Sequence, residues 1–152
     1  MVLYCLLSFL FLTCCGIDIF SIDYPSNWVI DNNLPDGNIG LKDKLVAPNF
    51  LVEIQTMQNT DSSFDQLVSS YLSQAGVTGY PITVQSQDKI TIGNKEAYRI
   101  QYTEPIGSTT CKNEDYAIND GQIVPIISFN NCDENSYASF LPIFDKMVST
   151  FR

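Results

Sequence analysis

Residues 89–129 read KITIGNKEAYRIQYTEPIGSTTCKNEDYAINDGQIVPIISF, and this stretch decides the fold. Between residues 98 and 102, apolar and polar side chains alternate. Because successive side chains on a β-strand point to opposite faces, this alternation predicts a strand with one apolar face. We expect the opposite face, which carries Arg99 and Gln101, to be in contact with water. The stretch as a whole predicts consecutive antiparallel strands.

Two turn signals divide the stretch into hairpins. Gly93-Asn94 follows one β-rich run, and Asp120-Gly121 lies between two others. Asp-Gly is a strong hairpin signal, because a type I′ turn needs positive φ at both central positions. Pro125 cannot donate a sheet hydrogen bond. We therefore expect it at an edge, at a bulge, or where its nitrogen faces away from the partner strand.

Further strands and helices complete the predicted domain. The predicted strands are residues 20–24, 28–30, 41–47 and 50–57, and the predicted helices are residues 61–75 and 136–151. Ser62 and Asp65 resemble a capping box at the start of the first helix. Pro142 is expected in the first turn of the main part of the last helix, where its missing N–H has no effect. These elements predict the α+β class, with an antiparallel β-sheet flanked by helices.

The size of the chain suits one folded domain. It has 152 residues, of which 45% are hydrophobic and 16% charged. These values favour a folded chain over a disordered one. We expect the apolar faces of the elements to meet in a single core. The residues expected in that core are Trp28, Ile54, Leu67, Tyr98, Ile100, Phe144 and Phe151.

Charge and composition exclude several classes of function. The net charge is −9, from 17 acidic and 8 basic residues. Nucleic-acid binding requires a basic surface, so we expect no nucleic-acid partner. The chain contains no histidine. This excludes Ser-His and Cys-His catalysis and every imidazole metal ligand.

The N-terminus resembles a secretory signal. Residues 2–12, VLYCLLSFLFL, are almost wholly apolar. This run is shorter than the about 20 residues that a membrane span needs, and it has the length of a signal-peptide core. A buried strand or helix is the alternative. We predict that residues 1–15 are a signal peptide or lipoprotein signal and that residues 18–152 form a single domain.

A cysteine pair follows the apolar run. Leu12-Thr13-Cys14-Cys15 resembles the lipobox of prokaryotic lipoproteins, in which a Leu and two small residues precede the lipidated cysteine. Cys15 is the predicted lipidation site, and Cys14 is the alternative, because Cys14 stands where Gly or Ala is usual. Two unmodified cysteines within a cleaved signal would also fit the pattern.

Cys111 and Cys132 are expected to form a disulfide bond. They are the two cysteines clear of the anchor region, and an exported domain meets oxidising conditions. A two-residue Asp120-Gly121 loop would place Cys111 opposite Asn130, so that Cys132 would be a diagonal neighbour. A bulge or a splayed strand end would then have to bring the two cysteines together. Two free thiols at strand ends are the alternative.

Three motifs carry a resemblance to a known family. They are FSIDYPSNW at residues 20–28, TIGNKEAYRIQY at residues 91–102, and YASFLPIFDKMVSTF at residues 137–151. In this order and spacing they resemble the PsbP-like family. The resemblance implies an antiparallel sheet flanked by helices, a PsbP-like α/β/α sandwich. The family includes extrinsic lumenal subunits of photosystem II, a Ran-binding import factor, and many exported prokaryotic proteins and lipoproteins, which this chain resembles most.

The resemblance and the composition favour a binding or assembly module over an enzyme. We expect an exported, extracytoplasmic monomer whose partner is a membrane or envelope protein. A lipid anchor, where one is added at Cys15 or Cys14, would be its only contact with the membrane. No cofactor is expected. Weak divalent-cation binding is the first alternative, although no metal ligands can be named and the loop at residues 31–38 does not have calcium-loop spacing. An uncharacterised enzyme is the second alternative.

Two groups of side chains bear on these alternatives. The acidic pairs Glu114-Asp115 and Asp133-Glu134 are expected in solvated turns and at strand ends, with no catalytic pair among them. Five tyrosines are candidates for an amphipathic contact surface, or else they pack half-buried on the sheet. They are Tyr24, Tyr80, Tyr98, Tyr102 and Tyr116.

Overall fold

A computed structural model of the chain describes residues 8–14, 17–31, 34, 38–43, 51–59, 63–75 and 81–152. The elements are β1 Ser8–Cys14, β2 Ile17–Tyr24, β3 Trp28–Asp31, β4 Ile39–Asp43, β5 Leu51–Gln58, α1 Phe64–Ala75, β6 Thr83–Ile92, β7 Lys95–Ile106, β8 Thr109–Ile118, β9 Ile123–Asn131 and α2 Glu134–Ser149. In the described residues, no helix is long and apolar enough to span a membrane.

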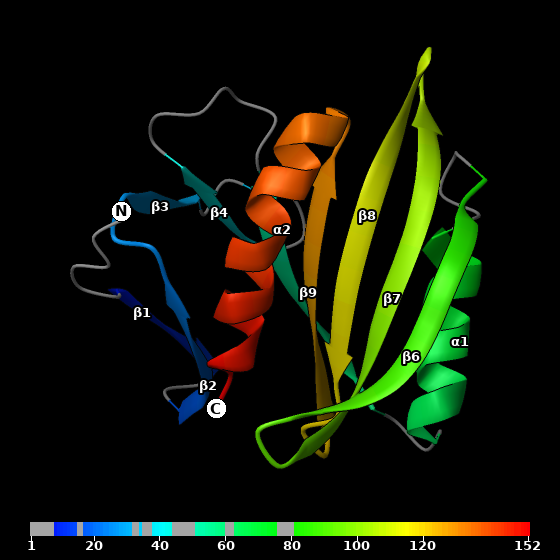
Figure 1. Cartoon of the computed structure of the whole chain (residues 1–152). Helices are drawn as coiled ribbons and strands as arrows, with labels where there is room; N and C mark the ends of the chain where they lie inside the picture. The colour runs from blue at the N-terminus through cyan, green and yellow to red at the C-terminus, as the bar shows by residue number, and fades with distance from the viewer. Residues whose placement is uncertain are drawn as a thin grey trace.

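Seven strands form one antiparallel sheet in the order β3-β4-β5-β9-β8-β7-β6, and β1 pairs separately with β2. Helix α2 packs against β9, β8 and β2 on one side of the sheet, and α1 lies on the other side (Figure 1). The chain therefore has the predicted α+β fold, an antiparallel sheet with a helix on each face.

The prediction of a single core is wrong, because the sheet separates the apolar residues into two clusters. On the α2 side, Trp28 and Ile54 pack with Phe144 and Phe151. On the α1 side, Leu67 packs with Ile100. Alternate residues of a strand point to opposite faces, so a sheet covered on both faces must have two cores.

Tight turns connect the last four strands. Gly93, Gly107 and Gly121 have φ values of 61°, 63° and 75°, which favour glycine at the first position of each turn. Asp120 pairs with Ile123, so the last turn is Gly121-Gln122 and not the predicted Asp120-Gly121.

This shift of the turn changes the predicted register between β8 and β9. Lys112 pairs with Asn131, which puts Cys111 level with Cys132 instead of Asn130. The two cysteines form a disulfide bond with their Cα atoms 3.9 Å apart. The bulge or splayed strand end expected from the sequence is therefore not required. The bond joins the start of β8 to the residue just before the N-cap of α2.

The predicted helix started at residue 61, three residues before α1 begins at Phe64, and the predicted capping residue was one residue too early. Gln66 N donates to Ser63 Oγ at 3.3 Å, and Ser63 N donates to Gln66 Oε1 at 3.1 Å. These reciprocal bonds are a capping box formed by Ser63 and Gln66. Ser62, which was predicted for this role, lies outside the described residues.

Helix α2 begins earlier than predicted and contains Pro142 in its interior. Asp133 is the N-cap, and its Oδ1 accepts from Ser136 N at 2.7 Å. The prediction that Pro142 lies in a first turn is wrong. Pro142 cannot donate to the carbonyl of Ala138, and both residues are exposed on the outer side of the helix, where water can satisfy that carbonyl.

The described part of the apolar N-terminal run, residues 8–12, lies in strand β1, and a strand was the alternative to a signal peptide for this run. β1 pairs with β2 from Ser8↔Tyr24 to Cys14↔Ile17. Cleavage of residues 1–15 and lipidation stay predictions. Cys14 is the last residue of β1, whereas Cys15 lies outside the described residues. Positions 44–50, which include the end of the predicted strand 41–47, also lie outside them.

Candidate functional site

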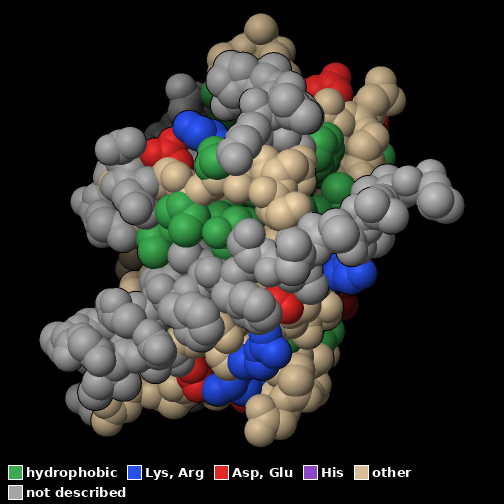
Figure 2. All heavy atoms as spheres, turned by 90° about the vertical axis from the view of Figure 1, so that its left-hand side faces the viewer, with side chains coloured by type: hydrophobic (Ala, Val, Ile, Leu, Met, Phe, Trp, Pro, Cys, Tyr) green, Lys and Arg blue, Asp and Glu red, His purple; other side chains and the backbone are tan. Residues whose placement is uncertain are grey.

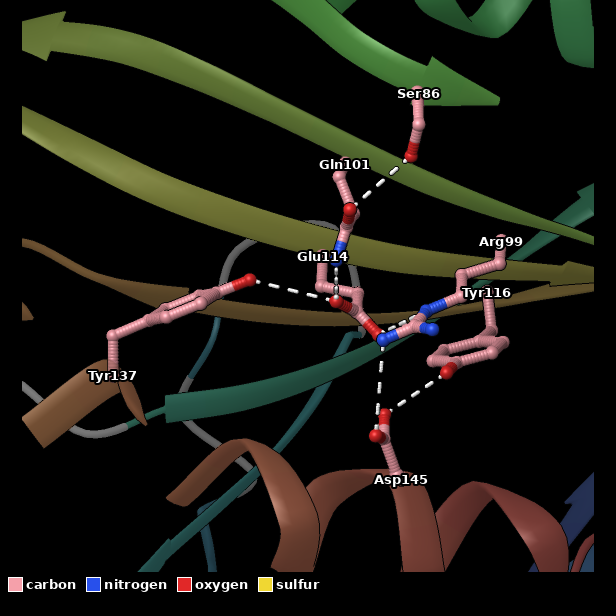
Figure 3. A network of polar contacts seen from close by, with 7 residues as sticks. All are labelled: Ser86, Arg99, Gln101, Glu114, Tyr116, Tyr137 and Asp145. Carbon is pink, nitrogen blue, oxygen red and sulfur yellow. Dashed lines mark hydrogen bonds and ion pairs between the residues drawn. The ribbon is translucent and has the colours of Figure 1, made fainter. Parts of the chain in front are cut away.

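A buried carboxylate, Glu114, organises a polar network between the sheet and α2 (Figure 3). Its side chain on β8 is 0% exposed. Arg99 Nε donates to Glu114 Oε1, and Gln101 Nε2 donates to Glu114 Oε2, each at 2.7 Å. The Tyr137 hydroxyl on α2 lies 3.5 Å from Glu114 Oε2. Donors from two elements thus surround the carboxylate.

The network extends from the carboxylate in two directions. Towards the sheet edge, Ser86 Oγ on β6 donates to Gln101 Oε1 at 3.2 Å. Towards α2, Arg99 Nη2 lies 3.8 Å from Asp145 Oδ2, and the Tyr116 hydroxyl donates to Asp145 Oδ1 at 2.9 Å. A continuous chain of polar contacts therefore links β6 to α2 through β7 and β8 (Figure 3).

Strand register explains why these side chains meet. Arg99 is opposite Tyr116, and Gln101 is opposite Glu114, in the antiparallel pairing of β7 with β8. Directly opposite residues share a face of the sheet with Cβ atoms about 5 Å apart, which is within reach of long polar side chains. The four side chains consequently form a compact polar group on the α2 side.

These contacts shift the pKa values of the charged groups in the network. Burial raises the pKa of Glu114, but hydrogen bonds from Arg99 and Gln101 outweigh burial and hold that pKa below its usual value. Hydrogen bonding to Glu114 raises the pKa of Arg99. Burial, together with the negative charge of Glu114, raises the pKa of Asp145 despite the Tyr116 hydrogen bond. Glu114 is therefore an ionised and fully bonded group, which is suited to positioning and poorly suited to proton transfer.

Glu114 and Asp115 correct the sequence interpretation. Both side chains are 0% exposed in the middle of β8, not in a solvated turn. Arg99 and Gln101 were expected in water, but they turn inward to bond Glu114. A signal for this was present, because Glu114 alternates in phase with Tyr116 and Ile118 on one face of a predicted strand. The second acidic pair, Asp133-Glu134, is exposed at the start of α2, as expected.

Asp115 points to the opposite side of the sheet, beneath α1. The Tyr71 hydroxyl on α1 donates to Asp115 Oδ2 at 2.7 Å. Burial raises the pKa of Asp115 to about 6, against the lowering effect of the Tyr71 hydrogen bond and of the nearby Ser128 and Tyr102 hydroxyls. Burial likewise raises the pKa values of Tyr71 and Tyr102, which keeps their hydroxyls protonated as donors. Asp115 is thus a buried acid that can change its charge in a mildly acidic range.

Beyond α2, the polar network borders a helix-free part of the sheet. In the described residues, neither helix lies over the α2-facing side of β6 and β7 (Figure 1). We call this surface the open half-face. Its side chains, which share this face through strand register, are Ser86, Asp88, Arg99, Gln101 and Thr103. Asp88 is exposed, and the others are half-buried. Hydrogen bonds to Glu114 fix two of these five side chains, Arg99 and Gln101.

A contact surface built from the five tyrosines is not found. Tyr24 and Tyr116 are buried at 8% and 5% exposure, while Tyr98 and Tyr102 pack against the core beneath α1. Tyr80 lies outside the described residues.

Apolar exposure does not define a contact surface either. The large hydrophobic residues described as exposed, Ile30, Val84 and Ile106, lie on three different strands. Figure 2 shows hydrophobic side chains in the middle of the face that it presents. We take the open half-face, which is polar, as the candidate contact surface because the Glu114 network orders its side chains.

A metal site was left unspecified by the sequence. Among the described residues there is no group of three or more acidic or cysteine side chains that could hold a metal ion. The loop at residues 31–38 is described only in part. The described geometry gives no support to a cation site.

Comparison with known proteins identifies the fold. No family model and no curated protein match the sequence. Among solved structures, cyanobacterial PsbP (CyanoP) from Synechocystis sp. PCC 6803 matches with a TM-score of 0.72 at 10% identity, covering 100% of this chain and 96% of that one. The Ran-binding protein Mog1p of Saccharomyces cerevisiae matches at 0.61 and 14% identity, with 96% and 94% covered. LpqN of Mycobacterium tuberculosis, involved in cell envelope biogenesis, matches at 0.59 and 10% identity, with 87% and 81% covered.

These matches and the α/β/α arrangement place the chain in one structural class. It is an α+β sandwich with an antiparallel sheet between two helices. More specifically, it has the PsbP-like/Mog1 fold, as the three sequence motifs implied. At 10–14% identity, the likeness defines the fold and leaves function to be argued from the chain's own residues.

Proposed function

We propose that this chain is a non-enzymatic binding or assembly module that docks a protein partner on the open half-face. The observation that carries the proposal is the Glu114 network. A carboxylate that is 0% exposed holds Arg99 and Gln101 in fixed positions beside a helix-free sheet surface. Fixed side chains lose little conformational entropy on binding, so a surface ordered in advance favours association.

The chemistry of the surface suits a protein partner. Arg99 is 33% exposed, and its guanidinium has N–H groups beyond the Nε–H that bonds Glu114 and the Nη2 that faces Asp145. Arg is enriched in interfaces because its planar group donates several hydrogen bonds and packs well. Ser86, Thr103 and Asp88 add adaptable polar contacts around it. The partner we expect presents hydrogen-bond acceptors to Arg99 in a mainly polar interface.

Binding fits this network better than catalysis does. Glu114 is ionised and saturated with donors, so it has little capacity to transfer a proton. The Cys111 and Cys132 sulfurs are joined to each other, which removes them as nucleophiles. Proteins of the same fold point the same way, since Mog1p is described as Ran-binding.

The proposed location is outside the cytoplasm, on a membrane or envelope protein. The apolar run at residues 2–12 and the Cys14-Cys15 pair favour export, with lipid anchoring at Cys15 or Cys14. The disulfide bond suits an oxidising compartment. LpqN, which shares the fold, is described as a protein of cell envelope biogenesis. The domain itself is proposed to act as a monomer.

Affinity capture from the native membrane tests the proposal. The variant Thr103→Arg places a bulky charge on the open half-face, and Ser70→Arg places the same side chain on the exposed side of α1. We expect the parent chain and Ser70→Arg to retain the same partner and Thr103→Arg to lose it. Equal recovery with all three chains, each shown to be folded, would place the binding surface elsewhere.

A further inference from the structure

The backbone of β2 has two edges, and each is used differently. Ser21 N donates to Arg152 O at 2.9 Å, and Arg152 N donates to Ser21 O at 3.1 Å. Asp23 N donates to Thr150 Oγ1 at 2.8 Å. The backbone groups of Ser21 and Asp23 therefore point towards the C-terminal end of the chain.

The backbone groups of the alternate residues must point the other way. N–H and C=O groups of successive residues in a strand face opposite edges. Phe20, Ile22 and Tyr24 thus direct their backbone groups away from Arg152. On that outer edge β1 runs antiparallel, with Leu12 opposite Phe20 and Leu10 opposite Ile22.

The outer edge of β2 is held rigidly by its side chains. Phe20, Ile22 and Tyr24 are 3%, 0% and 8% exposed and belong to the core on the α2 side. The Phe20 ring stacks on Phe151 at a centroid distance of 5.1 Å. Because these contacts anchor β2 in the core, we expect the strand to stay in place as a template when its neighbour is removed.

We infer that the outer edge of β2 is a strand-accepting site that takes an extended, apolar segment of a partner protein. The inference rests on the proposed export, because loss of residues 1–15 would remove β1 and leave this edge without its partner. An unpaired edge presents a row of donors and acceptors that a further strand can satisfy. The segment that fills it in the full chain, SFLFLTC, indicates the chemistry that fits: extended, seven residues long and mostly apolar.

A backbone-methylated peptide pair tests this site sharply. The protein is the chain of residues 17–152, and the probe is a fluorescent peptide of residues 8–14 with Cys14→Ser and flanking lysines for solubility. Methylation of the Leu10 nitrogen removes an N–H that faces β2, because Leu10 pairs with Ile22. Methylation of the Phe11 nitrogen is the matched control, because Phe11 pairs with Ser21, whose own backbone groups face Arg152.

We expect the unmodified and Phe11-methylated peptides to bind alike in fluorescence anisotropy. The Leu10-methylated peptide should bind at least about tenfold more weakly, which corresponds to about 1.4 kcal/mol. Equal binding of both methylated peptides, or no binding to a folded domain, overturns the inference. A dimer of the domain that the peptide does not dissociate overturns it too, because a second copy of β2 would then occupy the edge.

Circular dichroism covers the case in which residues 17–152 do not fold alone. Refolding by the Phe11-methylated peptide, and not by the Leu10-methylated one, supports the site. The absence of refolding by any peptide overturns it. The test uses residues 17–152 whatever the cellular N-terminus is, so its failure leaves docking on the open half-face standing, which Thr103→Arg examines separately.

Discussion

Asp115 should make the stability of the domain depend on pH in a direction opposite to that of an ordinary salt-bridged carboxylate. Burial raises its pKa from 3.8 to about 6. Between these values the folded chain retains a proton that the unfolded chain has released. The free energy of unfolding contributed by this group therefore falls as pH rises from about 4 to about 6, and the contribution is lost above that range.

The magnitude follows from the size of the shift. A change of one pKa unit corresponds to about 1.4 kcal/mol, so a shift of roughly two units gives up to about 3 kcal/mol. Asp115→Asn removes the titration. The free energy of unfolding of Asp115→Asn minus that of the parent chain should therefore be higher at pH 7 than at pH 4, by up to about 3 kcal/mol.

Urea unfolding at a series of pH values measures this difference. Trp28, the single tryptophan, is 4% exposed and reports unfolding by fluorescence. Asp88→Asn is the matched control, because it removes the same charge from an exposed position on β6. Tyr71→Phe should widen the pH window, since the Tyr71 hydrogen bond lowers the pKa of Asp115. A free-energy difference for Asp115→Asn that does not vary with pH would refute the reasoning.

Three further predictions concern packing and covalent state. Phe144 is 0% exposed in the α2-side core, so Phe144→Ala should lower the free energy of unfolding of the protein by about 3–5 kcal/mol, measured by urea unfolding. A negligible change would mean that α2 does not pack as described. Cys111 and Cys132 should be unreactive to thiol reagents in the unfolded, unreduced chain and reactive after reduction; labelling before reduction would contradict the bond. Mass spectrometry of the native protein should find an N-terminus between Cys14 and Phe20, and an intact Met1 would contradict export.

Local patterns in the sequence were sufficient to predict most of the fold. Alternation along residues 98–102 and the Gly93-Asn94 turn located the β6–β7 hairpin. Apolar residues at helical spacing located both helices, with errors of a few residues at their ends. These signals succeed because strand alternation and helical periodicity depend on near neighbours in the chain.

The errors arise where a distant residue decides the outcome. Asp120 was assigned to a turn, but it pairs with Ile123, so the turn lies one residue later and the register differs by two. Asp120 also forms an ion pair with Lys95, which lies on another strand. Glu114 was assigned to a solvated turn or strand end, but it is buried, and burial of a lone carboxylate is costly. Its partners Arg99 and Gln101 lie on another strand, so the compensation becomes visible only once that register is known.

The single core failed as a prediction for a similar reason. Composition and periodicity show which side chains are apolar, but they do not show on which face of a sheet each strand presents them. The assignment of Ile100 to the α1 side and Phe144 to the α2 side depends on which helix covers which face. That information belongs to topology.

Photo-crosslinking in intact cells that make this chain tests the docking surface most directly. A photoreactive side chain at Asp88 lies on the open half-face, and one at Ser70 lies on the exposed side of α1. Docking on the open half-face predicts a discrete crosslinked product with an envelope protein from position 88 and none from position 70. A product from position 70 alone, or no product from either position in folded protein at its native level, would contradict the account.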